Sequence, residues 1–108
     1  MDFDIDRVIQ DMIVAVVGVV KEEHGDISRY AKEIIEAEKE TMTELSELRI
    51  NGEITDDEFQ SELEDEKDTL VAQLKAVAVM ELAMTQKAVN AAIDVLVKAV
   101  GVAASSVL

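Results

Sequence analysis

Carboxylates are the side chains of this sequence most able to do chemistry, since the chain carries 24 Asp and Glu residues. Two groups recur at intervals that place their members on common helix faces. They are Glu33, Glu36, Glu40, Glu44 and Glu47, and then Glu62, Asp65 and Glu66. Inward-facing glutamates combined with Glu-x-x-His pairs build di-iron sites in helical bundles. A carboxylate bundle that binds iron at a subunit interface is therefore one hypothesis.

The rest of the sequence favours a solvated acidic face over that metal site. His24 is the only histidine, and Lys21 stands three residues before it, so the chain contains no Glu-x-x-His pair. Most of the carboxylates also fall on the outer faces of the expected helices. Accordingly, no metal-ligating residue, cofactor-binding residue or cofactor is expected.

Three glutamates are exceptions, because they lie at or beside positions that face a neighbouring helix: Glu38, Glu66 and Glu81. A polar residue at such a position often fixes the register of helix packing at a cost in stability. Register control is the favoured interpretation, and a pooled metal or proton site in an oligomer is the alternative.

Catalytic residues are not expected. The chain has no cysteine, a single histidine and four isolated glycines, so it offers neither a nucleophile–base pair nor a glycine-rich phosphate loop. The sequence therefore predicts a protein that is not an enzyme.

The charge is strongly negative and unevenly distributed. The formal net charge is −14, and residues 22–68 hold 18 Asp and Glu against 5 Lys and Arg. Nucleic acids and anionic lipids require a basic surface, so neither is an expected partner. Asp2, Asp4 and Asp6 stand where a signal peptide needs positive charge, which favours a cytoplasmic location.

A short segment predicts a sharp turn between two helices. Asn51 and Gly52 end the helix that precedes the turn, since positive φ is accessible there. Thr55 and Glu58 have the spacing of a capping box at the start of the next helix. Ile54 and Phe59 occupy the flanking positions of a hydrophobic staple. Together these residues predict a helical hairpin.

The chain is expected to form a single helical domain, residues 1–108. The expected helices cover about residues 5–23, 27–50 and 56–100, with Asp4 as the first N-cap and a tail at 101–108. The third would be roughly 70 Å long at the standard rise per residue. The first helix is expected to continue in line with the second and to cover the apolar half of the third. Its folding back onto the hairpin tip is the alternative.

The resulting fold class is all-α, an elongated antiparallel helical hairpin with an additional N-terminal helix, assembling into a multi-helix bundle. The third helix is apolar over most of its circumference in its second half, and large apolar patches mark partner surfaces. A homo-oligomer, dimer or higher, is expected. Its interface would use Met12, Ile13, Val16, Val17, Val20, Val77, Met84, Ala88, Val89, Ile93, Leu96 and Val100.

The apolar segments also raise a membrane hypothesis. A bilayer-spanning helix needs about 20 predominantly apolar residues. The longest apolar run of the first helix is flanked by Asp11 and Lys21, and Lys87, Asp94 and Lys98 interrupt the third. A membrane is therefore not an expected partner, and an amphipathic membrane-associated protein is kept as the third hypothesis.

One stretch of the sequence resembles a known family. Leu45, Leu48, Gly52, Ile54-Thr55, Glu58-Phe59 and Leu63 resemble the short helical hairpins called SHOCT domains, and a gas-vesicle accessory family carries a similar turn. The resemblance covers about residues 45–63. Asp57 stands where Glu is usual, and Glu62, Glu64 and Asp65 replace the basic residues common after the Phe. The resemblance implies oligomerisation or protein contacts.

The function expected from the sequence is that of a self-assembling structural or adaptor protein. Its acidic arm, residues 26–68, would serve solubility or bind a basic protein partner. Under this hypothesis Val16→Asp or Leu96→Asp breaks assembly, whereas Glu40→Ala does not.

Overall fold

The computed structural model describes residues 3–20, 27–78 and 80–107, and its regular structure in these ranges is entirely helical. The helices are α1 (Ile5–Val20), α2 (Ile27–Ala37), α3 (Lys39–Ile50), α4 (Asp56–Val77) and α5 (Leu82–Val107). The prediction of an all-α protein is confirmed. The expected end of the first helix at Glu23 and the expected break at residues 24–26 lie outside the described residues.

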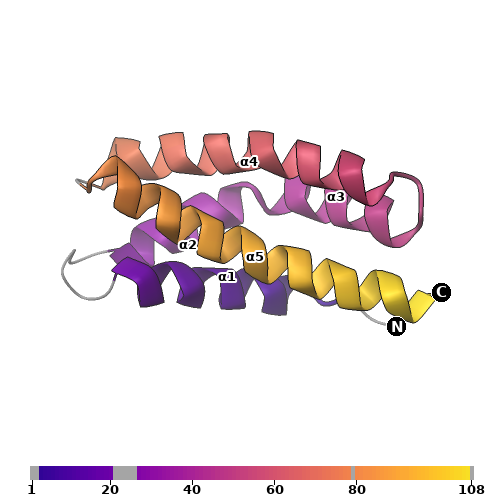
Figure 1. Ribbon diagram of the computed structural model, residues 1–108. Helices are drawn as coiled ribbons and strands as arrows, with labels where there is room; N and C mark the ends of the chain where they lie inside the picture. The colour runs from indigo at the N-terminus through magenta and orange to yellow at the C-terminus, as the bar shows by residue number, and fades with distance from the viewer. Residues whose placement is uncertain (1–2, 21–26, 79, 108) are drawn as a thin grey trace.

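The helices pack as a bundle in which successive rods alternate in direction (Figure 1). α2 and α3 together form one bent rod, which returns along α1. α1 makes its most extensive contacts with α5 and the next most with α2, while α4 packs on α5, α2 and α3. The start of α1 and the end of α5 lie at the same end of the bundle as the turn between α3 and α4. The long helices are thus neighbours within one chain.

Local capping signals in the sequence form as expected. The Arg7 backbone N–H donates to the Asp4 carboxylate at 3.2 Å, so Asp4 caps α1. Thr55 and Glu58 form both bonds of a capping box at the start of α4. Gly52 adopts φ +74°, the left-handed conformation that ends α3, while Asn51 stays in the right-handed region. The helical hairpin of the central sequence is confirmed.

The hydrophobic side chains that flank the capping box belong to the core. Phe59 is buried, and Ile54 is half-buried and packs against the core cluster. The Leu48 carbonyl accepts the backbone N–H groups of Glu53 and Ile54, at 2.8 and 3.3 Å. The turn is therefore held by hydrogen bonds on its polar side and by burial on its apolar side.

The helix expected over residues 27–50 is interrupted at Glu38. Its backbone has φ −99° and ψ 6°, and its N–H donates to Ile35 rather than one residue further back. Ile35 and Met42 are the buried residues on either side. A regular helix would turn position 38 or 39 toward the core after Ile35, and both positions are charged. The interruption therefore lets the chain resume core packing at Met42.

The prediction of one continuous helix over residues 56–100 is wrong, because the chain forms two helices there. α4 ends at Val77, the backbone of the next residue, Ala78, is extended, and α5 starts at Leu82. The Lys75 ammonium donates to the Met80 carbonyl at 2.6 Å, and the Thr85 hydroxyl donates to the Glu81 carbonyl at 3.0 Å. No proline or glycine marks this connection. Folding back buries the apolar face of α5 within the chain, and such tertiary packing overrides local helix propensity.

The bundle is consequently much shorter than the expected hairpin. Its extents are 43 × 23 × 19 Å, against the roughly 70 Å expected for one continuous helix. The expectation that the first helix lies in line with the second is also wrong, because α1 lies alongside α2 and α5. The alternative, in which the first helix folds back onto the acidic tip of the hairpin, is not observed either, because α1 contacts the apolar face of α5. The tail expected from residue 101 continues as the last two turns of α5.

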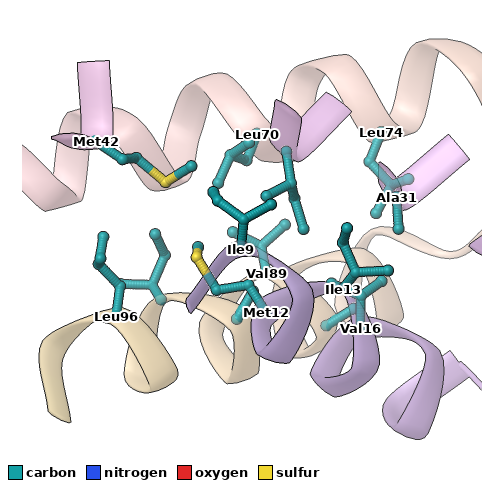
Figure 2. Packing of buried hydrophobic residues seen from close by; sticks show 14 of the residues in the cluster. Ile9, Met12, Ile13, Val16, Ala31, Met42, Leu70, Leu74, Val89 and Leu96 are labelled. Carbon is teal, nitrogen blue, oxygen red and sulfur yellow. The ribbon is translucent and has the colours of Figure 1, made fainter. Parts of the chain in front are cut away.

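Most residues expected at an oligomer interface form the core of the single chain. Figure 2 shows Met12, Ile13 and Val16 of α1 pointing toward Val89 of α5 and the neighbouring helices. The buried members of the expected set are Met12, Ile13, Val16, Val20, Ala88, Val89, Ile93, Leu96 and Val100. Val17 and Met84 are partly buried, and Val77 is 46% exposed. Because the chain folds back between α4 and α5, these side chains pack against helices of the same chain and not against a second copy.

Candidate partner-binding groove

An open groove of about 360 Å³ lies between α3 and α4. α3 contributes Thr41, Glu44, Leu45 and Leu48, and α4 contributes Glu62, Asp65, Glu66 and Thr69. The groove lies within the segment whose acidic charge was expected to face a partner. It is the candidate functional site, and we call it the α3–α4 groove.

Helical periodicity explains why these residues share one groove. On each helix the lining positions are spaced i, i+3, i+4 and i+7, which places them on one face. The capped turn around Gly52 makes α3 and α4 antiparallel neighbours, so the two stripes border the same depression. The turn chemistry thereby positions the groove.

The groove carries negative charge without internal neutralisation. None of the lining residues is a lysine or arginine, and Glu44, Glu62 and Asp65 form no ion pair with any described residue. The nearest cations along the chain are engaged elsewhere. The Lys67 ammonium lies 3.1 Å from the Glu64 carboxylate, and Arg49 lies 3.7 Å from Asp56 at the turn. The groove therefore presents unpaired carboxylates to solvent.

Leu45 and Leu48 add apolar surface to the acidic lining. Leu45 is half-buried and packs against the core cluster, whereas Leu48 is 36% exposed. Large exposed hydrophobic side chains are few among the described residues, and Leu48 shares the groove lining with four acidic residues. The groove therefore combines apolar contact area with a charged rim, as protein-binding surfaces do.

Glu66 is the buried carboxyl of the groove. It is only 5% exposed, and its Oε1 atom has no hydrogen-bond partner among the described residues. Burial, followed by hydrogen bonding to the Glu38 side chain and repulsion from its charge, raises the pKa of Glu66 to about 8. Near neutral pH the Glu66 carboxyl is therefore mostly protonated.

Two other hollows differ from this groove in charge. One, of about 460 Å³, lies between the start of α1 and the α2–α3 junction. There Lys39 pairs with Asp6, and the hydrogen bond with Asp6, followed by its charge, raises the pKa of Lys39. The other, of about 350 Å³, lies between the α3–α4 turn and the end of α5, where Arg49 faces Asp56. Cations within both hollows offset their carboxylates.

The carboxylates considered for metal binding are spread over the surface. Within residues 3–20, 27–78 and 80–107, no group of three or more His, Asp or Glu side chains is placed to hold a metal ion. Glu38 is half-buried, Glu66 is buried and Glu81 is exposed. Arg29 lies 4.0 Å from Glu33 on the same helix. The structure therefore brings together Glu38 and Glu66 alone of the three helix-facing glutamates.

By length and composition, one helix among the described residues could cross a membrane, over Leu82–Ser105. In the bundle this segment packs on α1, α3 and α4. A core helix with the same apolar content gives the same signal.

Glu66 can be singled out from the sequence, but the groove cannot. Glu66 was recognised because it interrupts an apolar series, which is a feature of the sequence alone. The lining pattern, with Thr41 and Leu48 on one helix and Glu62 and Thr69 on the other, was visible only as two separate stripes. Pairing them required the antiparallel register.

Comparison of the chain with protein-family models, with curated proteins and with solved structures finds no match.

Proposed function

We propose that this chain is a non-enzymatic binding module that holds a basic segment of a partner protein in the α3–α4 groove. The single observation that carries the proposal is an open groove lined by four acidic side chains and no cation. Opposite charges across an interface steer encounter and fix orientation. The net charge of −14 extends that attraction over the whole surface.

The groove favours a helical partner with a mixed face. Leu45 and Leu48 lie one turn apart on α3, so an apolar side chain of a partner helix finds contact area there. Glu44 and Asp65 border these leucines from α3 and α4. Lysine or arginine residues that flank the apolar anchors of a helix would meet these carboxylates. The partner class is therefore a basic amphipathic helix.

Self-assembly is not needed to complete this fold. Most of the apolar residues that were expected to join copies of the chain are buried within the single chain, where α1 and α4 pack on α5. Association of intact bundles would use a different surface. The adaptor role proposed here accordingly depends on the groove and not on an oligomer.

The test is titration of the protein with a lysine- and leucine-rich amphipathic peptide, followed by fluorescence anisotropy. The double variant Glu44→Gln with Asp65→Asn removes two groove carboxylates. Exposed ion pairs contribute about 0.2–1 kcal/mol each, so the loss of two should raise the Kd roughly twofold to thirtyfold. Added salt should weaken wild-type binding and reduce the difference between the proteins.

The matched control is Glu47→Gln with Asp68→Asn. These exposed residues lie on the same two helices outside the groove, and their substitution changes the net charge equally. The proposal expects this control to retain nearly wild-type affinity. Equal weakening by both double variants would mean that binding depends on the total charge of the protein and not on the groove, and the proposal would be wrong.

A further inference from the structure

Glu66 is a buried carboxyl whose hydrogen bonding the bundle leaves incomplete. The other two buried polar residues among those described are satisfied, since Ser46 donates to the Met42 carbonyl at 2.6 Å and Thr85 donates to the Glu81 carbonyl. Glu66 Oε1 has no such partner. A buried polar atom without a partner costs free energy, so such an atom in a native structure requires an explanation.

The location of Glu66 supplies that explanation. It lines the α3–α4 groove on the same face of α4 as Glu62, Asp65 and Thr69. Only 5% of the residue is exposed, whereas the other acidic residues of the lining are exposed, so Glu66 is the most deeply buried acidic residue of the lining and marks the base of the groove. Because Oε1 is itself enclosed, a donor group that enters from the open side would pass the exposed carboxylates of the lining and displace the side chains that cover this atom.

We infer that Glu66 is the anchor of the groove, and that it pairs with one lysine or arginine side chain of the basic partner helix. This inference rests on the function proposed above and names its specificity-determining residue. A long aliphatic stem would lie against Leu45 and Leu48 while its charged end reaches the base. A charge-assisted hydrogen bond to Oε1 would satisfy the atom that the bundle leaves unpaired.

Engagement of the anchor would release a proton. The neutral carboxyl of Glu66 loses its proton to solvent, and the carboxylate that remains pairs with the ammonium or guanidinium of the partner. The charged groups around Glu66 are Glu38 at the α2–α3 junction, Glu44 of α3, and Glu62 and Asp65 of α4. All are acidic, and the buried residues that α5 contributes to the core are uncharged. No described cation competes with the partner for this carboxyl.

The linked proton makes affinity depend on pH in a defined direction. Protonation of Glu66 below its pKa of about 8 opposes pairing with a cation. Affinity should therefore rise with pH up to that value and level off above it, by at most tenfold for each pH unit. The comparison of wild type with Glu66→Gln therefore isolates the pH dependence that Glu66 contributes to binding.

The experiment is calorimetric titration of wild-type protein and Glu66→Gln with the lysine- and leucine-rich peptide at pH 6, 7, 8 and 9. Glutamine keeps the size and neutral state of the protonated carboxyl, so the variant should fold, which circular dichroism checks. We expect wild-type Kd to fall as pH rises and the Glu66→Gln Kd to stay constant. Titration in two buffers of different ionisation enthalpy should show proton release by the wild type only.

The outcomes separate this inference from the proposed function. If Glu66→Gln binds with the same affinity and pH profile as wild type, while Glu44→Gln with Asp65→Asn weakens binding, the anchor is wrong and the groove stands. If none of these variants changes binding, both proposals fail. Glu47→Gln, an exposed residue of α3 outside the groove, is the control for loss of one charge and should match wild type throughout.

Discussion

Thr55 and Glu58 cap the start of α4 by binding each other's backbone. The Glu58 N–H donates to the Thr55 hydroxyl at 3.1 Å, and the Thr55 N–H donates to the Glu58 carboxylate at 2.9 Å. This pair fixes where α4 begins and hence how α3 and α4 align. Since both helices border the groove, the cap helps to position the candidate site.

Loss of the cap should destabilise the fold measurably. Thr55→Ala removes an N-cap side chain, which typically costs about 1 kcal/mol. Urea denaturation followed by circular dichroism should show that decrease in the free energy of unfolding. Ser61→Ala, in the exposed interior of α4, is the control and should be neutral or slightly stabilising. Equal decreases in the free energy of unfolding for the two variants would show that the Thr55 cap does not stabilise the fold.

The cap also makes a contribution that depends on pH. Hydrogen bonds from Thr55 lower the pKa of Glu58 below its ordinary value of 4.5. Its stabilisation is therefore fully present above the unfolded-state pKa and is lost as pH falls through the folded-state value. Glu58→Gln should reduce that acid sensitivity, measured as the difference between the unfolding free energies at pH 3 and pH 6.

Glu66 should give the opposite dependence. Its pKa of about 8 in the folded chain lies above the ordinary 4.5, so the folded state binds the proton more tightly. Relative to Glu66→Gln, wild-type stability should be unaffected below about pH 4.5 and should decrease between that value and about pH 8. The slope can reach about 1.4 kcal/mol for each pH unit.

Denaturation of both proteins at pH 4, 6 and 8.5 checks this prediction. Glu62→Gln, an exposed neighbour one turn away, is the control and should run parallel to wild type. Parallel curves for wild type and Glu66→Gln would show that the buried carboxyl does not carry the free-energy cost assigned to it.

Core substitutions distinguish an intrachain core from an interface between copies. Leu96 is fully buried in the bundle, whereas Val14 is 68% exposed. Leu96→Ala should cost about 2–5 kcal/mol of unfolding free energy, and Val14→Ala should cost little. Leu96→Asp should unfold the single chain rather than yield a folded smaller species. Light scattering combined with circular dichroism would contradict this by finding a folded variant of reduced mass.

The fold-back between α4 and α5 predicts a short distance across the molecule. Gln60 and Ser105 line the same hollow at one end of the bundle. A continuous helix would separate them by roughly 68 Å at about 1.5 Å per residue, whereas the longest extent of the bundle is 43 Å. Because the chain has no cysteine, spin labels at Gln60→Cys and Ser105→Cys would report this pair alone. A distance near the longer value would exclude the fold-back.

Local chemistry could be predicted from the sequence, and long-range packing could not. Asp4, Gly52 and Thr55 act through atoms within a few residues, so their spacing was sufficient to place the cap and the turn. The connection near Met80 carries no proline or glycine. It forms because α1 covers α5, and a contact so distant in sequence leaves no local signal.

The candidate site could likewise be predicted only in part from the sequence. Glu66 could be singled out because a carboxylate interrupts an apolar series. Its pairing with Glu38 could not be predicted, since it depends on the interruption between α2 and α3. The groove likewise exists only once α3 and α4 are set side by side in their antiparallel register.

The most direct test of the groove is chemical-shift mapping of ¹⁵N-labelled protein titrated with the lysine- and leucine-rich peptide. We expect the largest backbone shifts at residues that line the α3–α4 groove, among them Thr41, Leu45, Leu48, Glu62, Glu66 and Thr69. The acidic residues outside it, such as Glu47 and Asp68, should shift little. Shifts spread evenly over the acidic surface, or centred on α1 and α5, would contradict the account.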